Sequence, residues 1–431
     1  MKAGTLKSVL ALVIVISTGS RTGAQEPNAL TWQDCIARAA RQNPDLLSAL
    51  RSEEAGQAQY RGSFNNILPH LSLTNSYTDS NRTTVSGLTT SNSGSWQAQA
   101  GASLDVFNVA DWASIGTASA NYVQAQAALK SSSAVVLLNL YKAFSGLLYA
   151  QDQTSVAEDI HSLWKTNAEM IGLRYNFGRE SKGNKMRTDA QLLQAESDLA
   201  QASRDLRVAQ QALGQVLGEN QFQTLAVTGT WTRGSLSSEP PDLERWVDRS
   251  PRVWVQQAVV EQAKASLQNA HSALWPSLSL NYNRGYQSNS EFPTDNPYWV
   301  FTGQVSYPLF GSGPTATYDA SAAAQRNLEK AGEDLRSLRH QVRSDLESAW
   351  SALAQAQDQV RVQRAFLEAA RQRRKESDIR YQSGLMPFEE WQLVVVDLVN
   401  FEKSYLRSEQ TLVLSEAQWR FAKGEQLGEK Q

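Results

Sequence analysis

The feature that most constrains this 431-residue chain is an internal duplication. The segment RYNFG at residues 174–178 returns as RYQSG at residues 380–384, and each copy is followed by a run rich in Leu and Ala that ends in a glycine. The end of the run lies 40 residues after the turn in both copies, at Gly218 (218 − 178 = 40) and at Gly424 (424 − 384 = 40). This equal spacing indicates a duplicated structural unit.

Further matched pairs extend the repeat over most of the chain. Asn43-Pro44 returns as Ser250-Pro251 after 207 residues, and Phe107 returns as Phe310 after 203 residues. A period near 200 residues is too long for a solenoid repeat, so we interpret the chain as one body built from two pseudo-equivalent halves. We predict a first half at 25–218, a linker at 219–242, a second half at 243–424 and a tail at 425–431.

Residues 1–24 have the layout of a secretory signal peptide. Lys2 and Lys7 precede an apolar run, and small residues follow up to Ala24, where we predict cleavage. The apolar run is too short to cross about 30 Å of hydrocarbon, which argues against the alternative of a membrane anchor. No later stretch is expected to span a membrane as a helix, and the single cysteine, Cys35, is predicted to be a buried free thiol.

Hydrophobic spacing predicts long helices for most of the chain. Residues 31–67 have helical spacing with a bend at Pro44, and runs without an interior proline cover 108–174 and 315–380. A helix of about 70 residues is about 105 Å long. Shorter helices are expected at 185–217, 243–274 and 388–423. Since two short helices match the length of one long helix, we predict that two short helices, stacked end to end, flank each long one, with 219–242 at a junction.

Two stretches change from helical to strand periodicity. Apolar and polar residues alternate in 70–78 and in 96–106, with a loop rich in Ser, Thr and Asn predicted at 79–95. The second half repeats this hairpin at 276–287 and 299–307. Aromatic residues cluster near the second loop, as in an interfacial girdle: Tyr282, Tyr286, Tyr298 and Trp299. The alternative is a soluble sheet of two hairpins.

If the hairpins cross a membrane, the chain is expected to oligomerise. The four strands of one chain cannot close a barrel, and open strand edges are excluded from hydrocarbon. A trimer supplies twelve strands, an even number within the bacterial range, whereas the eight strands of a dimer leave little room for a channel. The polar strand faces would then line the lumen.

The order and spacing of these motifs resemble those of TolC-type outer-membrane efflux proteins. The resemblance covers 30–424 and rests on Asn43-Pro44, on LPHL at 68–71, on YPLF at 307–310 and on the doubled RYxxG turn. It implies a homotrimer with a twelve-stranded β-barrel in the outer membrane and an α-helical barrel of long antiparallel hairpins in the periplasm. It also implies docking to a periplasmic adaptor and an inner-membrane pump. The chain would be a passive conduit for small molecules or a secreted protein, not an enzyme.

The same resemblance implies roles for the two turns. The adaptor-docking tip would comprise Arg174, Tyr175, Gly178, Arg380, Tyr381 and Gly384. Tyr381 would also close the tunnel by a hydrogen bond to a neighbouring helix, and Glu390 stands where the family often has an acidic constriction residue. The acidic ring is thinner than is common, because Leu393 stands where a second acid is often found and Asn184 is the equivalent in the first copy. The alternatives are that the Arg and Tyr residues only stabilise the turns and that Glu390 is an ordinary solvated helix residue.

Other classes of function lack their residues in this sequence. The four histidines are dispersed, and no phosphate-binding glycine loop is present, so we predict no metal, cofactor or catalytic site. A net charge of −2 gives no reason to expect nucleic acid as a partner. The competing hypothesis is a secreted, non-channel coiled-coil protein with a structural or adhesive head. Such a protein would not need apolar strand faces toward lipid.

Overall fold

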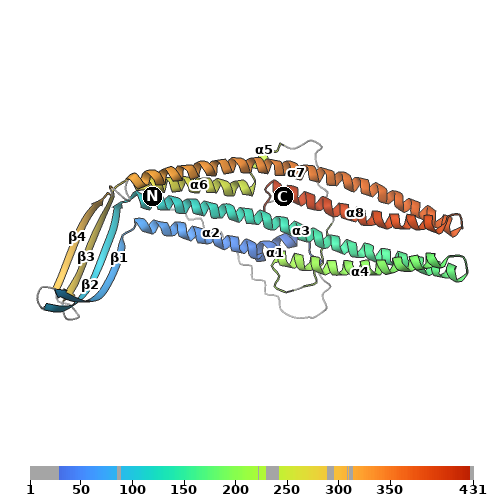
Figure 1. The fold of residues 1–431 in the computed structure, drawn as a ribbon, viewed down its shortest axis with the longest axis horizontal. Coiled ribbons are helices and arrows are strands. Elements are labelled where there is room, and N and C mark those ends of the chain that lie inside the picture. Colours follow the sequence, from blue (N-terminus) through green and yellow to red (C-terminus); the bar gives the residue numbers. More distant parts are fainter. Residues whose placement is uncertain are drawn as a thin grey trace, which may run out of the picture.

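The computed structural model describes residues 29–84, 89–221, 223–229, 242–288, 296–307, 309 and 314–427. The predicted signal peptide lies outside these ranges, as does the tail from residue 428. The molecule is a helical rod with a β-sheet at one end and two helical turns at the other (Figure 1). Its elements are α1 (Trp32–Gln42), α2 (Pro44–Ser63), η1 (Phe64–Ile67), β1 (His70–Thr84), β2 (Thr89–Phe107), α3 (Val109–Asn176), α4 (Lys182–Leu217), α5 (Glu244–Val247), α6 (Pro251–Ser272), β3 (Ser277–Ser288), β4 (Asn296–Ser306), α7 (Pro314–Gln382) and α8 (Phe388–Ala422).

The helices follow the predicted pairing. α3, with 68 residues, is about 102 Å long, and it contacts α2 in one part and α4 in another. α7 contacts α6 and α8 in the same way, and contacts of α3 with α6 and α8 join the two halves (Figure 1). Each long helix is therefore flanked by two shorter ones, as the lengths predicted.

Two proline positions end one helix and begin the next. Asn43 caps α2 by accepting a hydrogen bond from the amide of Leu46 at 2.9 Å, and Pro44 occupies the first turn, where it needs no amide hydrogen. Pro251 likewise occupies the first turn of α6, so the prediction of a single helix over 243–274 is wrong. It divides into the short α5 and the longer α6.

The long helix α3 contains a window that is long and apolar enough to cross a membrane, judged by length and composition. Of that window, 61% is buried inside the molecule, so these apolar residues belong to the core between the helices. Composition alone does not distinguish a core helix from a spanning one, so this window does not contradict the expectation that no helix spans a membrane.

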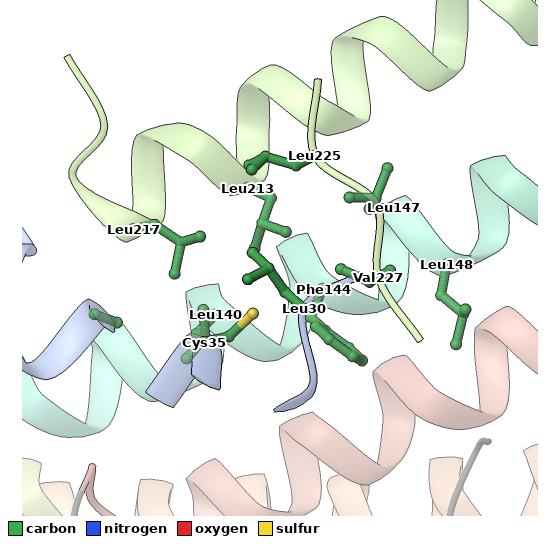
Figure 2. Close-up of a cluster of buried hydrophobic side chains, with 11 residues drawn as sticks. Leu30, Cys35, Leu140, Phe144, Leu147, Leu148, Leu213, Leu217, Leu225 and Val227 are labelled. Atoms are coloured by element: carbon green, nitrogen blue, oxygen red, sulfur yellow. The ribbon is translucent and has the colours of Figure 1, made fainter. Parts of the chain in front are cut away.

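The equatorial junction holds a compact apolar core (Figure 2). Side chains from α1, α3 and α4 meet there with Leu225 and Val227, which belong to the predicted linker. Leu30 and Val227 form a parallel bridge, with the amide of Leu30 donating to the carbonyl of Ala226 at 2.8 Å. Cys35 is fully buried in this core, as predicted, and burial raises the pKa of its thiol to about 11. The linker segment thus seals the joint between α1 and α4.

The sheet is antiparallel with strand order β1-β2-β3-β4. The hairpins of the two halves meet where β2 pairs with β3, for example at Ala102 and Tyr282. The predicted loop at 79–95 is wrong, because β1 and β2 continue to pair from Asp79 opposite Gly94 up to Thr84 opposite Thr89. Ser, Thr and Asn favour loops by composition, but Thr also favours strands, and an established register extends the ladder of hydrogen bonds.

Candidate functional site

One face of the sheet is apolar and faces outward. Because residues paired across antiparallel strands share a face, the register places Leu71, Ala102, Tyr282 and Phe301 in one row. Leu71 is 81% exposed and Leu73 is 89% exposed. No segment among the described residues covers these side chains, so the face is suited to contact with lipid.

The opposite face of the sheet is polar. It carries Gln97, Gln99, Ser103, Asn281 and Thr302 at the alternating positions. A sheet with one apolar and one polar face, and with β1 and β4 as its edges in the described part of the chain, has the pattern of a segment of a membrane barrel.

Three of the four predicted girdle residues lie together on the apolar face. Tyr282, Tyr286 and Trp299 occupy it at alternating positions of β3 and β4, and all three are exposed. Tyr298 differs from the prediction: it lies on the polar face, where its hydroxyl donates to Gln99 Oε1 at 2.8 Å. These four aromatic residues were grouped by their proximity in the sequence, whereas adjacent residues of a strand face opposite sides.

The two helical turns at the far end of the rod have the same backbone geometry. The amide of Gly178 donates to the carbonyl of Tyr175 at 2.9 Å, and the amide of Arg179 donates to the carbonyl of Arg174 at 2.8 Å. The second turn repeats both bonds around Gly384. The two glycines have φ values of 70° and 74°, which is the left-handed conformation of a helix-ending glycine.

The duplicated tyrosines lie in different surroundings. Tyr175 is exposed, whereas Tyr381 is 2% exposed and stacks on Trp391 with ring centroids 4.6 Å apart. The Tyr381 hydroxyl donates to Glu180 Oε1 at 2.9 Å, which links the second turn to the first. Burial raises the pKa of Tyr381, and Glu180 raises it further, so the phenol remains a hydrogen-bond donor.

Arg174 joins the same contact from the first turn. Its guanidinium carbon lies 4.3 Å from the centre of the Tyr381 ring, and its Nη2 donates to the Tyr381 carbonyl at 3.4 Å. Arg380, the equivalent residue of the second turn, is exposed. The predicted tip residues are therefore of two kinds: Arg174 and Tyr381 bind the turns together, and Tyr175, Gly178, Arg380 and Gly384 lie at the surface.

A second layer of contacts supports Tyr381. Trp391 Nε1 donates to Asp378 Oδ1 at 2.8 Å, and Arg374 Nε donates to Asp378 Oδ2 at 2.8 Å. The Arg374 guanidinium also lies 5.0 Å from the Trp391 ring. These contacts fix the Trp391 ring, and through it the position of the Tyr381 hydroxyl.

The predicted constriction residues are placed as follows. Glu390 and Leu393 are both exposed and lie one turn apart on α8, so they share one side of that helix. Asn184 is half-buried, and its Nδ2 donates to Glu180 Oε2 at 2.9 Å. Glu180 thus accepts hydrogen bonds from both Tyr381 and Asn184.

Sequence reasoning missed several residues of this region. Glu180 was overlooked because its partner Tyr381 lies 201 positions away in the other half. Phe177 and Leu385, one at each turn, are both 78% exposed. Large apolar residues exposed at two equivalent turns could have been noticed in the sequence, because each is adjacent to the glycine of its turn.

Comparisons with known proteins agree with this geometry. The model of the family described as outer membrane efflux protein matches residues 35–219 and 243–424. Among solved structures, CusC is similar with a TM-score of 0.80 and 18% identity, covering 91% of each chain. The CmeC outer membrane channel of Campylobacter jejuni has a TM-score of 0.80 and 15% identity, covering 99% of this chain and 96% of that chain.

A third solved structure, the open state of the MtrE outer membrane channel of Neisseria gonorrhoeae, has a TM-score of 0.79 and 19% identity. The match covers 92% of this chain and 89% of that chain. At such low identities these structures establish the fold, while the family match spans both halves of the chain. The chain belongs to the outer membrane efflux protein family, and it is the outer-membrane channel component of an efflux system, a passive conduit that extends into the periplasm.

Proposed function

We propose that three copies of this chain close a twelve-stranded barrel in the outer membrane and continue as a helical tube through the periplasm. The observation that carries this proposal is the exposed apolar face of a four-stranded sheet with two edge strands. Unpaired strand edges cannot stand in hydrocarbon, so β1 of one copy pairs with β4 of the next. Members of the family function as trimers with adaptor and pump partners in general.

The orientation of the barrel follows from its aromatic residues. Tyr286 and Trp299 lie on the apolar face in the half of the β3–β4 hairpin away from the helices, and Tyr282 lies on the same face at the middle of β3. We assign them to the outer membrane interface, where Tyr and Trp are enriched. Tyr298 and the Gln residues of the opposite face then line the lumen.

The two turns form the docking surface for a periplasmic adaptor, which couples the channel to an inner-membrane pump. Phe177 and Leu385 supply exposed apolar contact, and Tyr175, Arg380 and the two turn glycines surround them. Small interfaces of this kind favour exposed aromatic and Arg side chains at their centre. The cargo is small molecules or a secreted protein.

Tyr381 acts from beneath this surface as part of the gate. Its bond to Glu180 and the contact with Arg174 tie the α7–α8 turn to the α3–α4 turn. While these contacts hold, the α3–α4 turn and the α7–α8 turn cannot move apart. Glu390, exposed on α8, gives each copy one negative charge near this end of the tunnel.

The oligomeric state tests the barrel. Protein extracted from outer membranes with detergent is analysed by size-exclusion chromatography with light scattering, with correction for bound detergent. Three copies per particle are expected. A monomer that stays soluble without detergent would contradict the barrel and favour the secreted coiled-coil protein.

The gate is tested by the conductance of single channels in planar bilayers. Tyr381→Phe removes the bond to Glu180 but keeps the stacking on Trp391, and a hydrogen bond to a charged group is worth about 1.5–3 kcal/mol. We expect a higher conductance and more frequent opening. Tyr175→Phe, at the equivalent position of the exposed first turn, is the matched control and should conduct like the parent. Equal conductance of both variants would remove Tyr381 from the gate.

A further inference from the structure

Arg284 is an unusual residue on the apolar face of the sheet. It lies in the row Leu73, Ala100, Arg284 and Trp299, on the face that we assign to lipid. From the row of Leu71 to the row of Tyr77, Arg284 is the only charged side chain on this face among the described residues. A guanidinium is costly in hydrocarbon, so its presence here requires a reason.

Arg284 has no anionic partner in the described part of the chain. The side chain is exposed, and it makes no hydrogen bond or ion pair with the part of the chain that the structure describes. Its neighbours on the same face are aromatic: Tyr282 and Tyr286 on its own strand and Trp299 directly across. Aromatic rings stabilise a cation at a membrane interface, but they do not neutralise its charge.

A hollow lies beside Arg284. It has a volume of about 470 Å³, and Leu73, Ala98, Ala100, Arg284 and Tyr286 contribute to its lining. The small alanines of β2 form its floor between the larger side chains of β1 and β3. The hollow lies over β2, between β1 and β3, on the face that we assign to lipid, so pairing of the β1 and β4 edges leaves it open to the membrane.

We propose that Arg284 binds the phosphate of an anionic lipid, and that an acyl chain of the same lipid lies in the hollow over Ala98 and Ala100. Arg284 lies four residues before the end of β3, in the half of the β3–β4 hairpin away from the helices, and its long side chain can extend along the sheet toward the lipid headgroups. A guanidinium matches two phosphate oxygens with parallel hydrogen bonds. Arg284 thus matches the phosphate of a phospholipid, and the apolar hollow beside it matches an acyl chain.

This inference rests on the proposed insertion of the sheet into the outer membrane. It is tested on the intact trimer in detergent by native mass spectrometry during titration with phosphatidylglycerol. Diacylglycerol with the same acyl chains and inorganic phosphate are the comparison probes. The variants are Arg284→Gln, which removes the charge, Arg284→Lys, which keeps the charge without the planar fork, and Ala100→Phe, which fills the hollow.

We expect the parent to bind phosphatidylglycerol in preference to diacylglycerol. Arg284→Gln should weaken phosphatidylglycerol binding by roughly tenfold, the loss of a charge-assisted hydrogen bond. Arg284→Lys should bind phosphatidylglycerol with intermediate affinity. Ala100→Phe should weaken the binding of both phosphatidylglycerol and diacylglycerol. Arg326→Gln, an exposed arginine on α7, is the matched control and should bind like the parent.

Two results would overturn the inference while leaving the channel intact. One is an Arg284→Gln trimer of normal heat stability that binds phosphatidylglycerol as tightly as the parent. The other is displacement of the lipid by millimolar inorganic phosphate with no effect of Ala100→Phe, which would make the site one for free anions. If the parent chain does not form a trimer, the proposed function itself is contradicted.

Discussion

Gly178 and Gly218 end their helices in the same way but in different surroundings. Both have positive φ values, of 70° and 82°. A Cβ added at Gly178 would meet nothing within 4 Å, whereas a Cβ added at Gly218 would lie 2.2 Å from the carbonyl oxygen of Gln42. Gly424 has the same close approach to the carbonyl of Arg249, at 2.3 Å. The equatorial glycines therefore allow two helix ends to meet, and those at the tip only reverse the chain.

This difference predicts unequal effects of alanine at the two sites. Gly178→Ala should cost about 1 kcal/mol for the left-handed backbone alone. Gly218→Ala should cost about 3 kcal/mol, because the clash with α1 adds a packing penalty of about 2 kcal/mol. Thermal unfolding of the detergent-solubilised proteins measures the difference. A Gly178→Ala protein less stable than Gly218→Ala would contradict the close approach.

For single residues, the sequence predicted the place in the fold better than it predicted which residues contact each other. The turns, the buried Cys35 and the break at Pro44 follow from local patterns of residues. The partner of Tyr381 does not, because Glu180 comes from the other half of the chain and one sequence carries no record of which turns lie together. Tyr298 was grouped with the aromatic residues of the apolar face for a simpler reason. The alternation of side-chain direction along a strand was not applied to it.

At the scale of elements, the contact between α3 and α8 includes two acids. Asp152 lies on α3 and Glu409 on α8, where the Glu409 carboxylate accepts a hydrogen bond from Tyr405 at 2.6 Å. Burial raises the pKa of Asp152, and the charge of Glu409 raises it further. The ionised form of Asp152 is thus disfavoured in the folded helix pair.

The sign of this shift predicts a pH dependence. A raised folded-state pKa means that stability is greatest below the unfolded value of about 3.9 and falls as the pH rises through the folded value. Asp152→Asn should therefore raise the unfolding temperature at pH 7 and change it little near pH 3. Glu158→Gln, an exposed acid on the same helix, is the control. A variant that stabilises equally at both pH values would show that ionisation is not the cause.

The bounds of the elements were predicted unevenly. The long helices were found to within a few residues, because periodicity persists over many turns and proline or glycine marks the ends. The outer ends of β1 and β2 were missed, since their residues carry loop composition and only the pairing of one strand with the other extends them. Strand pairing depends on both segments, so it cannot be predicted from the sequence of either segment alone.

At the scale of the whole molecule, the membrane decides which substitutions are tolerated. Leu73 lies on the apolar face, and the next residue, Thr74, lies on the polar face. Leu73→Arg adds a charge to the face assigned to lipid and should cost up to about 2–4 kcal/mol, because the penalty grows with depth in the bilayer. Thr74→Arg, on the face that we assign to the lumen, should be tolerated. The yield of heat-stable trimer in isolated outer membranes measures both, and equal yields would show that the two faces are assigned wrongly.

The pairing of β2 with β3 has a consequence for the order in which the molecule forms. Ala102 pairs with Tyr282, 180 residues further along the chain, whereas α3 and α4 are neighbours in sequence. Contacts between distant segments form slowly, because the entropy of closing a long loop is lost before the contact contributes favourable free energy. The first helical hairpin can therefore form from neighbouring segments, whereas β2 can pair with β3 only once the second half of the chain is present. We expect the four-stranded sheet to be completed after the first helical hairpin.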